Sequence, residues 1–492
     1  MANARLIWIG YFGKSSFAHA DVLKRLRQRH VIDFCAAVGG KPNQGDDVVL
    51  DKPLISYLDA LFARYQSLEG NFEAEIDRRS YEHFSPFEGE TLRMMDRLHF
   101  RGPKYQFHDC FDTRRTMFLR HCAYWKFFLK ENEITHVLFC GIPHEVFTFV
   151  LYKVAKILEI PTLILHPEKS GLAQKFDGIL YGSFARKSMH QNLFYVSKSI
   201  EDVGIWDLSS EIGRASQDLN IEILRGAPFS QILKESENAH TQSTRIIRQS
   251  SLLRFFSELK NQSIRPREIY FFLRRSILSD LQRREHLKIS QGSENSQNSV
   301  IYFLSYQPEE SSSPRAGIFV EQFFAIKCVA DSLPDGWTLR VREHPDQYGR
   351  RRPRPRRFLR EISEISRVSI VPLDETVNQS FSNVRAAAGI AGTSCVEAWL
   401  RKIPLLLLGD MLLKKAPGVF FIETKDDISK AFERIQNGNQ INQNEIDDFV
   451  SWTSENSYVG SLGKIDSSMP DLYKDTVSNL DAIISTWLSL TS

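Results

Sequence analysis

Three stretches in the C-terminal half decide the fold, namely VIYFLSYQPE at 300–309, TLRVREHP at 338–345 and AAAGIAGTSC at 386–395. Each contains a short apolar run of the length of a buried strand and ends on polar or small residues. A helical pattern at Ile318–Ser332 separates the first two. Strands joined by helices of this length pair in parallel, which predicts a layered α/β unit. Ser369–Pro372 and Pro404–Leu408 are predicted as further strands of this unit.

The N-terminal part shows the same alternation of strand and helix patterns. The predicted strands are Leu6–Phe12, Val31–Val38, His136–Cys140 and Thr162–His166, and the predicted helices are Phe17–His30, Asp112–Glu131 and Glu145–Leu158. Strand–helix–strand around 136–166 again indicates parallel pairing. A second, similar α/β unit is therefore predicted ahead of the first.

A change in character from about residue 196 suggests the domain limits. Segments near 251–284 are helical, apolar on one side and basic on the other, and a polar tract at 290–299 resembles a linker. We predict an α/β protein with a Rossmann-like domain at 1–195, a helical connecting region at 196–298, a Rossmann-like domain at 299–470 and a C-terminal helix at 471–492.

The bulk composition narrows the class of protein. A chain of 492 residues is too long to form a single hydrophobic core, so more than one domain is expected. A net charge of +3 is too small to favour binding to nucleic acid. The six cysteines form no C-x-x-C pair, which favours a reducing cytoplasm over a disulfide framework or zinc. No apolar run reaches the length of a membrane span. We predict a cytoplasmic protein that contacts no nucleic acid, with peripheral contact to the inner membrane face left open.

The turn after the strand at 386–390 is the leading candidate for a phosphate site. Gly392 allows close backbone approach, and Thr393 and Ser394 offer hydroxyls at a helix start, where an anion is favoured. Cys395 and Glu397 follow, and Ser394 with Glu397 also fits a capping box. A helix start with no ligand explains the same residues, so both interpretations stay open.

His344 and Pro345 end the strand at 338–343 and lie in the same predicted unit as that turn. Because proline stops the strand, the imidazole is predicted at the sheet edge, where it can donate a hydrogen bond to a phosphate. An isolated His-Pro pair is otherwise a surface turn. Gln307 and Glu309 follow the first strand of the unit and are candidates for contacts to ribose or sugar hydroxyls. A solvated loop explains the same residues without a ligand.

In the N-terminal unit, His144 and Glu145 follow a strand and begin a helix. Glu145 suits the first helical turn electrostatically and is also the best-placed carboxylate for a general base or nucleophile. Glu168, after the next strand, is its rival. Gly10 and Lys14 lie in a tight turn that does not match the phosphate-loop spacing and are predicted to line an acceptor surface.

Arginines between 342 and 360 form a basic stretch that includes Arg342 and Arg350. A solvated loop is the simplest explanation, and an anionic glycan or acidic lipid headgroups are the functional ones. No Asp-x-Asp occurs, so a diphosphate held by a divalent metal is not indicated. We therefore predict no metal and no cofactor, with protein donors stabilising a leaving phosphate.

At these residues the chain resembles the bacterial capsular polysaccharide synthesis family of glycosyltransferases, which includes the capsule β-Kdo transferases. The resemblance rests on the order of five elements: YQPE at 306–309, LPDG at 333–336, REHP at 342–345, GTS at 392–394 with Glu397-Ala398, and 404–409. It departs at Ser394 and Cys395, which replace the usual small residue and glycine around the phosphate turn. It also departs at the bulky Trp399 and at Arg401-Lys402-Ile403, where a glycine-lysine pair is common.

The resemblance implies a GT-B fold, with two Rossmann-like domains facing across a cleft and the donor nucleotide in the C-terminal one. It also implies a CMP-activated 2-keto sugar acid such as Kdo as donor, its phosphate held by His344, Thr393 and Ser394. The expected partners are this nucleotide-sugar and a glycan or lipid-linked glycan acceptor. The alternatives are a UDP- or GDP-sugar transferase or epimerase, and a non-catalytic scaffold or glycan-binding protein.

Overall fold

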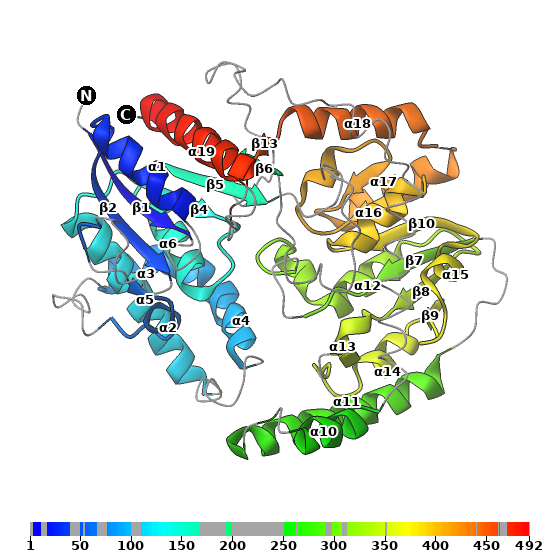
Figure 1. The fold of residues 1–492 in the computed structure, drawn as a ribbon. Coiled ribbons are helices and arrows are strands. Elements are labelled where there is room, and N and C mark those ends of the chain that lie inside the picture. The colour runs from blue at the N-terminus through cyan, green and yellow to red at the C-terminus, as the bar shows by residue number, and fades with distance from the viewer. Residues whose placement is uncertain are drawn as a thin grey trace. The chain divides into compact units, whose positions relative to one another are not determined.

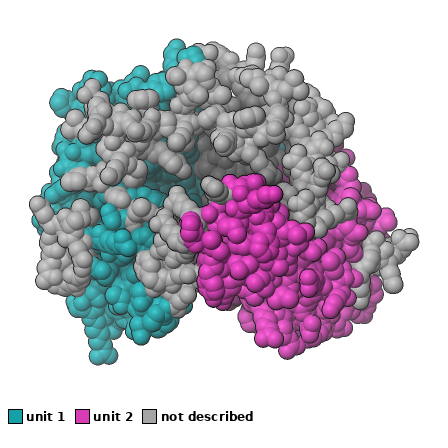
Figure 2. Space-filling model, turned by 60° about the horizontal axis from the view of Figure 1, so that its bottom comes forward, with its two compact units in different colours: residues 1–95, 108–227, 450–492 teal, residues 96–107, 228–449 magenta. Residues whose placement is uncertain are grey.

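The structure of this chain is a computed structural model. It describes residues 3–10, 17–39, 50–52, 55–65, 76–99, 110–167, 193–198, 250–261, 264, 266–290, 298–307, 312–349, 352–438, 440–460, 462 and 470–491. The chain forms two compact units (Figure 2). Unit 1 comprises residues 1–95, 108–227 and 450–492, and unit 2 comprises residues 96–107 and 228–449.

Unit 1 is built on a seven-stranded sheet in the order β13-β6-β5-β4-β1-β2-β3. Neighbours from β3 to β5 pair in parallel, whereas β6 pairs antiparallel with both β5 and β13. The strands are β1 (Ala4–Ile9), β2 (Ile32–Gly39), β3 (Ile55–Ser56), β4 (His136–Cys140), β5 (Thr162–Pro167), β6 (Leu193–Ser197) and β13 (Tyr458–Val459). The parallel core order, 3-2-1-4-5, is that of a Rossmann-like sheet.

Helices cover the unit 1 sheet on both faces (Figure 1). The helices of the unit are α1 (Phe17–Gln28), α2 (Tyr57–Leu61), α3 (Arg78–Phe84), η2 (Ser85–Phe87), α5 (Phe111–Glu131), α6 (Val146–Ile157) and α19 (Pro470–Thr491). Helix α4 (Glu88–His99) belongs to unit 1 up to residue 95. Nine of the twelve residues of α6 are buried, in keeping with a helix that is apolar almost all round.

Unit 2 contains a six-stranded sheet in the order β12-β11-β10-β7-β8-β9, and every neighbouring pair is parallel. The strands are β7 (Ser299–Phe303), β8 (Thr338–Arg342), β9 (Val368–Ile370), β10 (Val384–Gly389), β11 (Leu405–Leu407) and β12 (Val419–Phe421). Counted within the unit, this order is 6-5-4-1-2-3, the doubly wound Rossmann order. Val300, Ile301 and Tyr302 are fully buried because both faces of a parallel sheet are covered.

The helices of unit 2 connect and cover these strands (Figure 1). They are α10 (Ser251–Lys260), η5 (Pro266–Glu268), α11 (Ile269–Ile289), η6 (Gly317–Val320), α12 (Gln322–Asp331), α13 (Pro345–Gly349), α14 (Phe358–Ser363), α15 (Val377–Phe381), α16 (Thr393–Leu400), η7 (Leu412–Lys415) and α17 (Lys425–Gln436), with α18 (Gln443–Glu455) leading back to unit 1. The predicted α/β class with two Rossmann-like, parallel-sheet units is confirmed.

The units of the structure differ from the predicted domains in several places. One is β13, which lies within the predicted C-terminal domain but is a strand of the unit 1 sheet. The polar tract at 290–299 is not a boundary between the units, because α11 before it and β7 after it both belong to unit 2. The C-terminal helix, predicted as a separate segment at 471–492, is α19, and it packs against α1 in unit 1. Its residues Leu480, Ile483 and Trp487 are buried in the same apolar cluster as Leu6 and Trp8 of β1.

Candidate functional site

The strand order of unit 2 reverses between β7 and β10, and this point defines the candidate site. The two strands are adjacent and in register, with Phe303 opposite Gly389, so both end at the same edge of the sheet. On the other side of β7, Arg342 of β8 is also level with Phe303. Ligands of open α/β sheets bind outside the carboxyl ends of the strands at such a switch point.

The turn after β10 carries the predicted phosphate residues to this switch point. Gly392 is the N-cap of α16 with φ of 116°, and no atom lies within 4 Å of a Cβ added there. Thr393 is exposed and Ser394 half-buried, and neither hydroxyl forms a hydrogen bond in the described part of the chain. Backbone N–H groups and two hydroxyls are thus available at a helix N-terminus, which favours an anion.

The predicted capping box at this turn is wrong. The helix begins at Thr393, and Ser394, predicted to be the N-cap, already lies in the first turn. Gly392 provides the cap position without a side-chain hydrogen bond. The helix therefore begins where the backbone turns at Gly392, which frees the Ser394 hydroxyl from a capping role.

Cys395 and Glu397, predicted to bind nucleotide, point into unit 2. Cys395 is 1% exposed, and a Cβ added at Gly389 would lie 2.9 Å from its Sγ, so the small residue on β10 makes room for the thiol. Burial raises the pKa of Cys395 to about 12. Glu397 is 4% exposed. Both side chains are therefore enclosed within unit 2, and their role in nucleotide binding stays a prediction.

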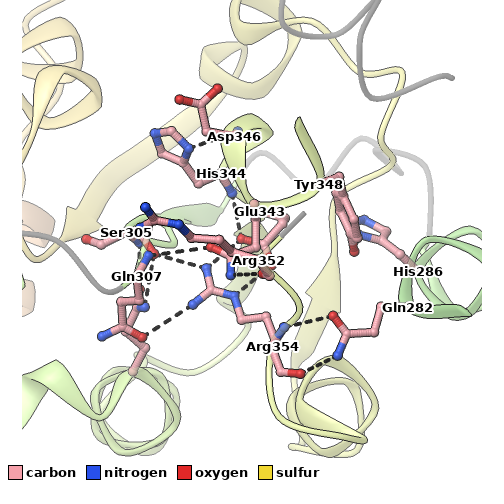
Figure 3. Close-up of polar contacts among 12 residues, drawn as sticks. Gln282, His286, Ser305, Gln307, Glu343, His344, Asp346, Tyr348, Arg352 and Arg354 are labelled. Carbon is pink, nitrogen blue, oxygen red and sulfur yellow. Dashed lines mark hydrogen bonds and ion pairs between the residues drawn. The ribbon is translucent and has the colours of Figure 1, made fainter. Parts of the chain in front are cut away.

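His344 follows β8 at the same sheet edge. Its Nδ1 accepts a hydrogen bond from the Asp346 N–H at 3.1 Å, so the neutral imidazole carries its proton on Nε2 (Figure 3). The ring lies 5.5 Å from that of Tyr306, which follows β7, and the Arg352 guanidinium lies 4.6 Å from the centre of the Tyr306 ring. An N–H donor and a cation thus flank the end of β7, next to the α16 turn.

A buried ion pair underlies His344. The Arg354 guanidinium donates to both oxygens of Glu343, at 2.6 and 2.9 Å, and these side chains are 4% and 1% exposed. Arg354 also donates to the Ser305 carbonyl at 3.0 Å, and Glu343 accepts the His344 N–H at 2.7 Å (Figure 3). The pair therefore joins the ends of β7 and β8 and fixes the backbone that carries His344.

The other predicted nucleotide and anion residues of unit 2 have structural contacts. Gln307 donates from Nε2 to the Val320 carbonyl at 2.5 Å and accepts from Arg354 at 3.4 Å, so its amide is held within the unit. Pro345 is the first residue of α13, where its missing N–H costs nothing. Glu309 and Arg350 lie outside the described residues.

Arg342 was predicted on an anion-binding surface, but its guanidinium donates to the Ser380 hydroxyl at 2.5 Å inside unit 2. Burial lowers its pKa to about 10, with the nearby Glu375 carboxylate opposing the effect, so it stays protonated at neutral pH. The residue as a whole is half-buried at the end of β8, and its place on an anion-binding surface stays a prediction.

The predicted residues of unit 1 also gather at a switch point, the one between β1 and β4, where Ile9 lies opposite Phe139. Glu145 is the N-cap of α6, and its N–H donates to the Thr148 hydroxyl at 3.1 Å. His144 lies beside it, with Nε2 3.8 Å from Glu145 Oε1 and Nδ1 bonded to the Ile142 carbonyl at 2.7 Å. Glu145 thus has a structural role at the start of α6, and its carboxylate, whose side chain is 15% exposed, lies beside the His144 imidazole.

Gly10, at the end of β1, is explained by packing. A Cβ there would lie 2.9 Å from the Trp8 indole nitrogen and 3.2 Å from Cys140 Sγ. Lys14 and Glu168, the latter the rival of Glu145, lie outside the described residues. The predicted acceptor surface around Gly10 and Lys14 therefore stays a prediction.

A pocket of about 410 Å³ lies elsewhere in unit 1, between α3, α5 and the C-terminal end of α6. Its lining includes Lys126, whose Nζ donates to the Ser80 hydroxyl at 2.8 Å, and none of the predicted site residues. Within the described ranges, no three His, Cys, Asp or Glu side chains are grouped to hold a metal. Nor does any described helix combine the length and hydropathy needed to cross a bilayer.

No protein-family model matches the chain. No curated protein matches it either.

Solved structures similar to this chain include the UDP-GlcNAc 2-epimerase of Methanocaldococcus jannaschii in complex with UDP-GlcNAc and UDP, at 11% identity and a TM-score of 0.23, covering 92% of this chain and 99% of the epimerase. A calicheamicin glycosyltransferase matches at 12% identity and a TM-score of 0.21, and the match covers 99% of this chain and 98% of the glycosyltransferase. A variant of the wall teichoic acid polymerase TagF matches at 9% identity and a TM-score of 0.23, and the match covers 98% of this chain and 89% of the polymerase. At these scores the likeness supports no activity and no residue role in this chain.

Sequence reasoning missed the supporting residues of the site. Arg352 and Arg354 belong to the basic stretch for which a solvated loop is the simplest explanation, yet Arg354 as a whole residue is only 7% exposed. Glu343 was part of the strand-end motif but was not given a role. The alternation of arginine with proline at 352–355 was the only local signal that this loop is extended and can place a guanidinium beneath a strand end.

Proposed function

We propose that this chain is a metal-independent glycosyltransferase that moves a sugar from a nucleotide donor to a glycan or lipid-linked glycan of a bacterial surface polysaccharide. One observation carries the proposal. At the switch point of unit 2, β7 lies between β10 and β8, and the uncapped N-terminus of α16 follows β10 while His344 follows β8. Two strand spacings, about 10 Å, separate β8 from β10, a span that suits a nucleotide phosphate with its sugar.

The favoured donor is a CMP-activated 2-keto sugar acid such as Kdo, which follows from the resemblance of the strand-end motifs to capsule β-Kdo transferases. A CMP donor has a single phosphate, which one helix N-terminus and one imidazole donor suffice to neutralise without a metal. Thr393 and Ser394 would hold the phosphate oxygens, and His344 would donate to the oxygen on which charge develops.

In the proposed reaction the acceptor hydroxyl attacks the anomeric carbon of the donor sugar. The bond between that carbon and the phosphate oxygen breaks, and CMP leaves with the bonding electrons. The acceptor proton passes to a carboxylate, for which Glu145 is the candidate. Each nucleotide-site residue therefore stabilises negative charge that grows as the bond breaks, which is the requirement for lowering the barrier.

Nucleotide binding tests the proposal. We expect CMP at millimolar concentration to raise the unfolding temperature of the protein by several degrees, because a ligand at about 100 times its Kd adds about 2.7 kcal/mol. The double variant Thr393→Val/Ser394→Ala should reduce the shift, whereas Ser429→Ala, an exposed serine on α17, should not.

The other outcomes are equally informative. A shift with UDP or GDP but not CMP would overturn the proposed donor and leave the site in place. The absence of a shift with every nucleotide and nucleotide-sugar would overturn the transferase and favour a scaffold or glycan-binding protein.

A further inference from the structure

Helices α10 and α11 of unit 2 expose an unusual amount of apolar surface. Of the twelve large hydrophobic side chains that are exposed among the described residues, seven lie on this helix pair: Leu253, Phe256, Tyr270, Ile277, Leu278, Leu281 and Leu287. Tyr270 is 76% exposed and Leu253 71%. Single exposed apolar residues are ordinary in soluble proteins, but a concentration on one hairpin marks an interaction surface.

Three of the exposed apolar side chains of α11, those of Tyr270, Ile277 and Leu281, lie in one line with three cations. We define the outer row as Tyr270, Arg274, Ile277, Leu281, Arg284 and Lys288, which follow one another at intervals of three and four residues. Every member is exposed. Three members of the row have large apolar side chains and three have basic ones, and none is a carboxylate. A face that is merely solvated usually mixes charges of both signs, so this composition calls for an anionic, partly apolar partner.

The opposite side of α11 is fixed to unit 2, which leaves the outer row facing away from it. His286 donates from Nε2 to the Val371 carbonyl at 2.8 Å, and its Nδ1 accepts from the Tyr348 hydroxyl at 3.0 Å (Figure 3). The Gln282 side chain accepts the Arg354 N–H at 2.8 Å. The row is therefore not a core face awaiting closure, and Figure 1 draws α10 and α11 along the outer margin of unit 2.

Helix α10 is joined to α11 by a buried polar contact. Asp280 accepts the N–H groups of Ser251 and Leu252 at 2.7 and 3.1 Å, which satisfies the first turn of α10. This contact holds α10, with its exposed residues Leu253, Phe256, Ser257 and Lys260, next to α11. Both helices are thus held rigidly, and their exposed side chains form a preorganised surface.

We propose that the outer row of α11, with the exposed side of α10, binds the surface of an anionic lipid bilayer. A straight row from 270 to 288 extends about 27 Å, and such a linear, convex face suits a planar fluid surface better than a groove in a protein. The apolar side chains would enter the headgroup–acyl boundary, and Arg274, Arg284 and Lys288 would contact lipid phosphates. The surface is independent of the proposed transfer reaction.

The inner side of α11 contacts residues of the candidate site, so a bilayer on the outer row would be held at a fixed orientation to that site. Gln282, on the inner side of α11, holds the backbone of Arg354, and Arg354 pairs with Glu343 beneath His344. A bilayer bound to the outer row would therefore fix the orientation of the β7–β8 edge relative to the lipid headgroups. This arrangement suits an acceptor carried on a lipid.

Vesicle co-sedimentation of the full chain tests the proposal. Vesicles of phosphatidylcholine alone are compared with vesicles containing 30% phosphatidylglycerol, at low and at high salt. We expect binding to the anionic vesicles that weakens at high salt. The variant Arg274→Gln/Arg284→Gln/Lys288→Gln should lower the partition coefficient about 100-fold, since each cation near such a surface contributes about a factor of five. Ile277→Ser/Leu281→Ser should lower it about 10-fold or more.

Matched control variants remove equivalent side chains outside the row. Lys425→Gln/Lys430→Gln/Arg385→Gln removes three exposed cations, and Phe324→Ser removes a 58% exposed aromatic on α12. Both should bind the anionic vesicles like the natural sequence. Circular dichroism and the unfolding temperature establish whether each variant is folded, which is expected because the changed residues are exposed.

Three results would overturn the proposal. One is no binding to anionic vesicles, and another is binding that the row variants leave unchanged. The third is a protein that self-associates through the row, in which case Ile277→Ser/Leu281→Ser would abolish a dimer in sedimentation analysis without altering vesicle binding.

Discussion

Arg354 and Glu343 show how single residues build the candidate site. Their ion pair is almost fully enclosed and ties Ser305, at the end of β7, to the backbone of His344, at the end of β8. Removing one partner from such a pair is costly because the remaining charge stays buried, whereas removing both is much less so. The pair is therefore important for geometry more than for net stability.

We expect Arg354→Met to destabilise unit 2 by about 3–5 kcal/mol, because the Glu343 carboxylate is left buried without its guanidinium. The double variant Glu343→Leu/Arg354→Met should recover most of that loss in urea unfolding followed by hydrogen exchange of unit 2 peptides. Nucleotide binding should not recover with it, since His344 loses its backbone anchor. A double variant that binds nucleotide normally would remove this role from the pair.

For His344 itself, alanine should lower kcat/KM for sugar transfer about 10- to 100-fold, the range expected for losing a hydrogen bond to a charged group worth about 1.5–3 kcal/mol. His344→Gln retains an N–H donor and should keep more of the activity. Unfolding temperatures of both variants should match the natural protein, since the ring is only half-buried. Unchanged kinetics in His344→Ala would exclude it from the reaction.

At the scale of elements, the N-termini of α16 and α6 show two solutions to the same problem. Helix α16 begins at a glycine with φ of 116° and no side-chain cap, whereas α6 begins at Glu145 with a Thr148 hydroxyl on its N–H. The first leaves its donors available to a ligand, and the second uses a side chain to satisfy part of them. The α16 turn is accordingly the better anion site.

Gly392→Ala should cost about 1–3 kcal/mol and weaken nucleotide binding, because the positive φ is strained for an L side chain although no atom obstructs the new Cβ. Gly89→Ala is the matched control, since its Cβ also meets open space and it lies within helix α4. That change should be neutral or stabilising by up to about 1 kcal/mol. Calorimetric titration with CMP and urea unfolding of both variants give the comparison.

The two roles of the α6 N-terminus can be separated. Thr148→Val should destabilise unit 1 by about 1 kcal/mol, because the Glu145 N–H loses its acceptor, and should leave kcat nearly unchanged. Glu145→Gln should do the reverse, with stability retained and turnover lowered about 100-fold or more through loss of a general base. Equal activity of Glu145→Gln and the natural sequence would transfer that role to another carboxylate.

For the whole molecule, the C-terminal helix links the end of the chain to the N-terminal unit. His136 of β4 and Thr491 of α19 meet at 2.9 Å between Nε2 and Oγ1, and the Trp487 ring packs edge-on to the imidazole. Burial lowers the pKa of His136 to about 4 from its ordinary 6.5. The neutral ring is therefore part of the contact that holds α19.

This contact predicts a pH dependence. Because the folded pKa is lower than the unfolded one, the unfolded chain binds the proton more tightly, and stability is complete above about pH 6.5. It should fall between about pH 6.5 and 4, by up to about 3 kcal/mol, and level off below that. Hydrogen exchange of α19 peptides in the natural chain and in His136→Gln, which cannot titrate, isolates this contribution. Parallel pH curves for the two proteins would refute it.

The sequence predicted those features of the fold that depend on interactions between residues close together in the chain. The strand limits at 136–140 and the helix at 146–157 were predicted within one residue, because an apolar run and a 3.6-residue period are local signals. The start of α16 was misplaced because Gly392 and Ser394 are both good cap residues, and only the backbone conformation decides between them.

The sequence by itself determined that this protein consists of two α/β units, with Gly392–Ser394 and His344 just after strands, since periodicity and turn chemistry act over a few residues. Only the tertiary structure decided the strand order that brings those strand ends to one edge, the pairing of Arg354 with Glu343, the exposure of the outer row and the docking of α19 on unit 1. The physical reason is that these contacts join residues far apart in the chain. Their energies depend on burial and on partners that no local pattern specifies.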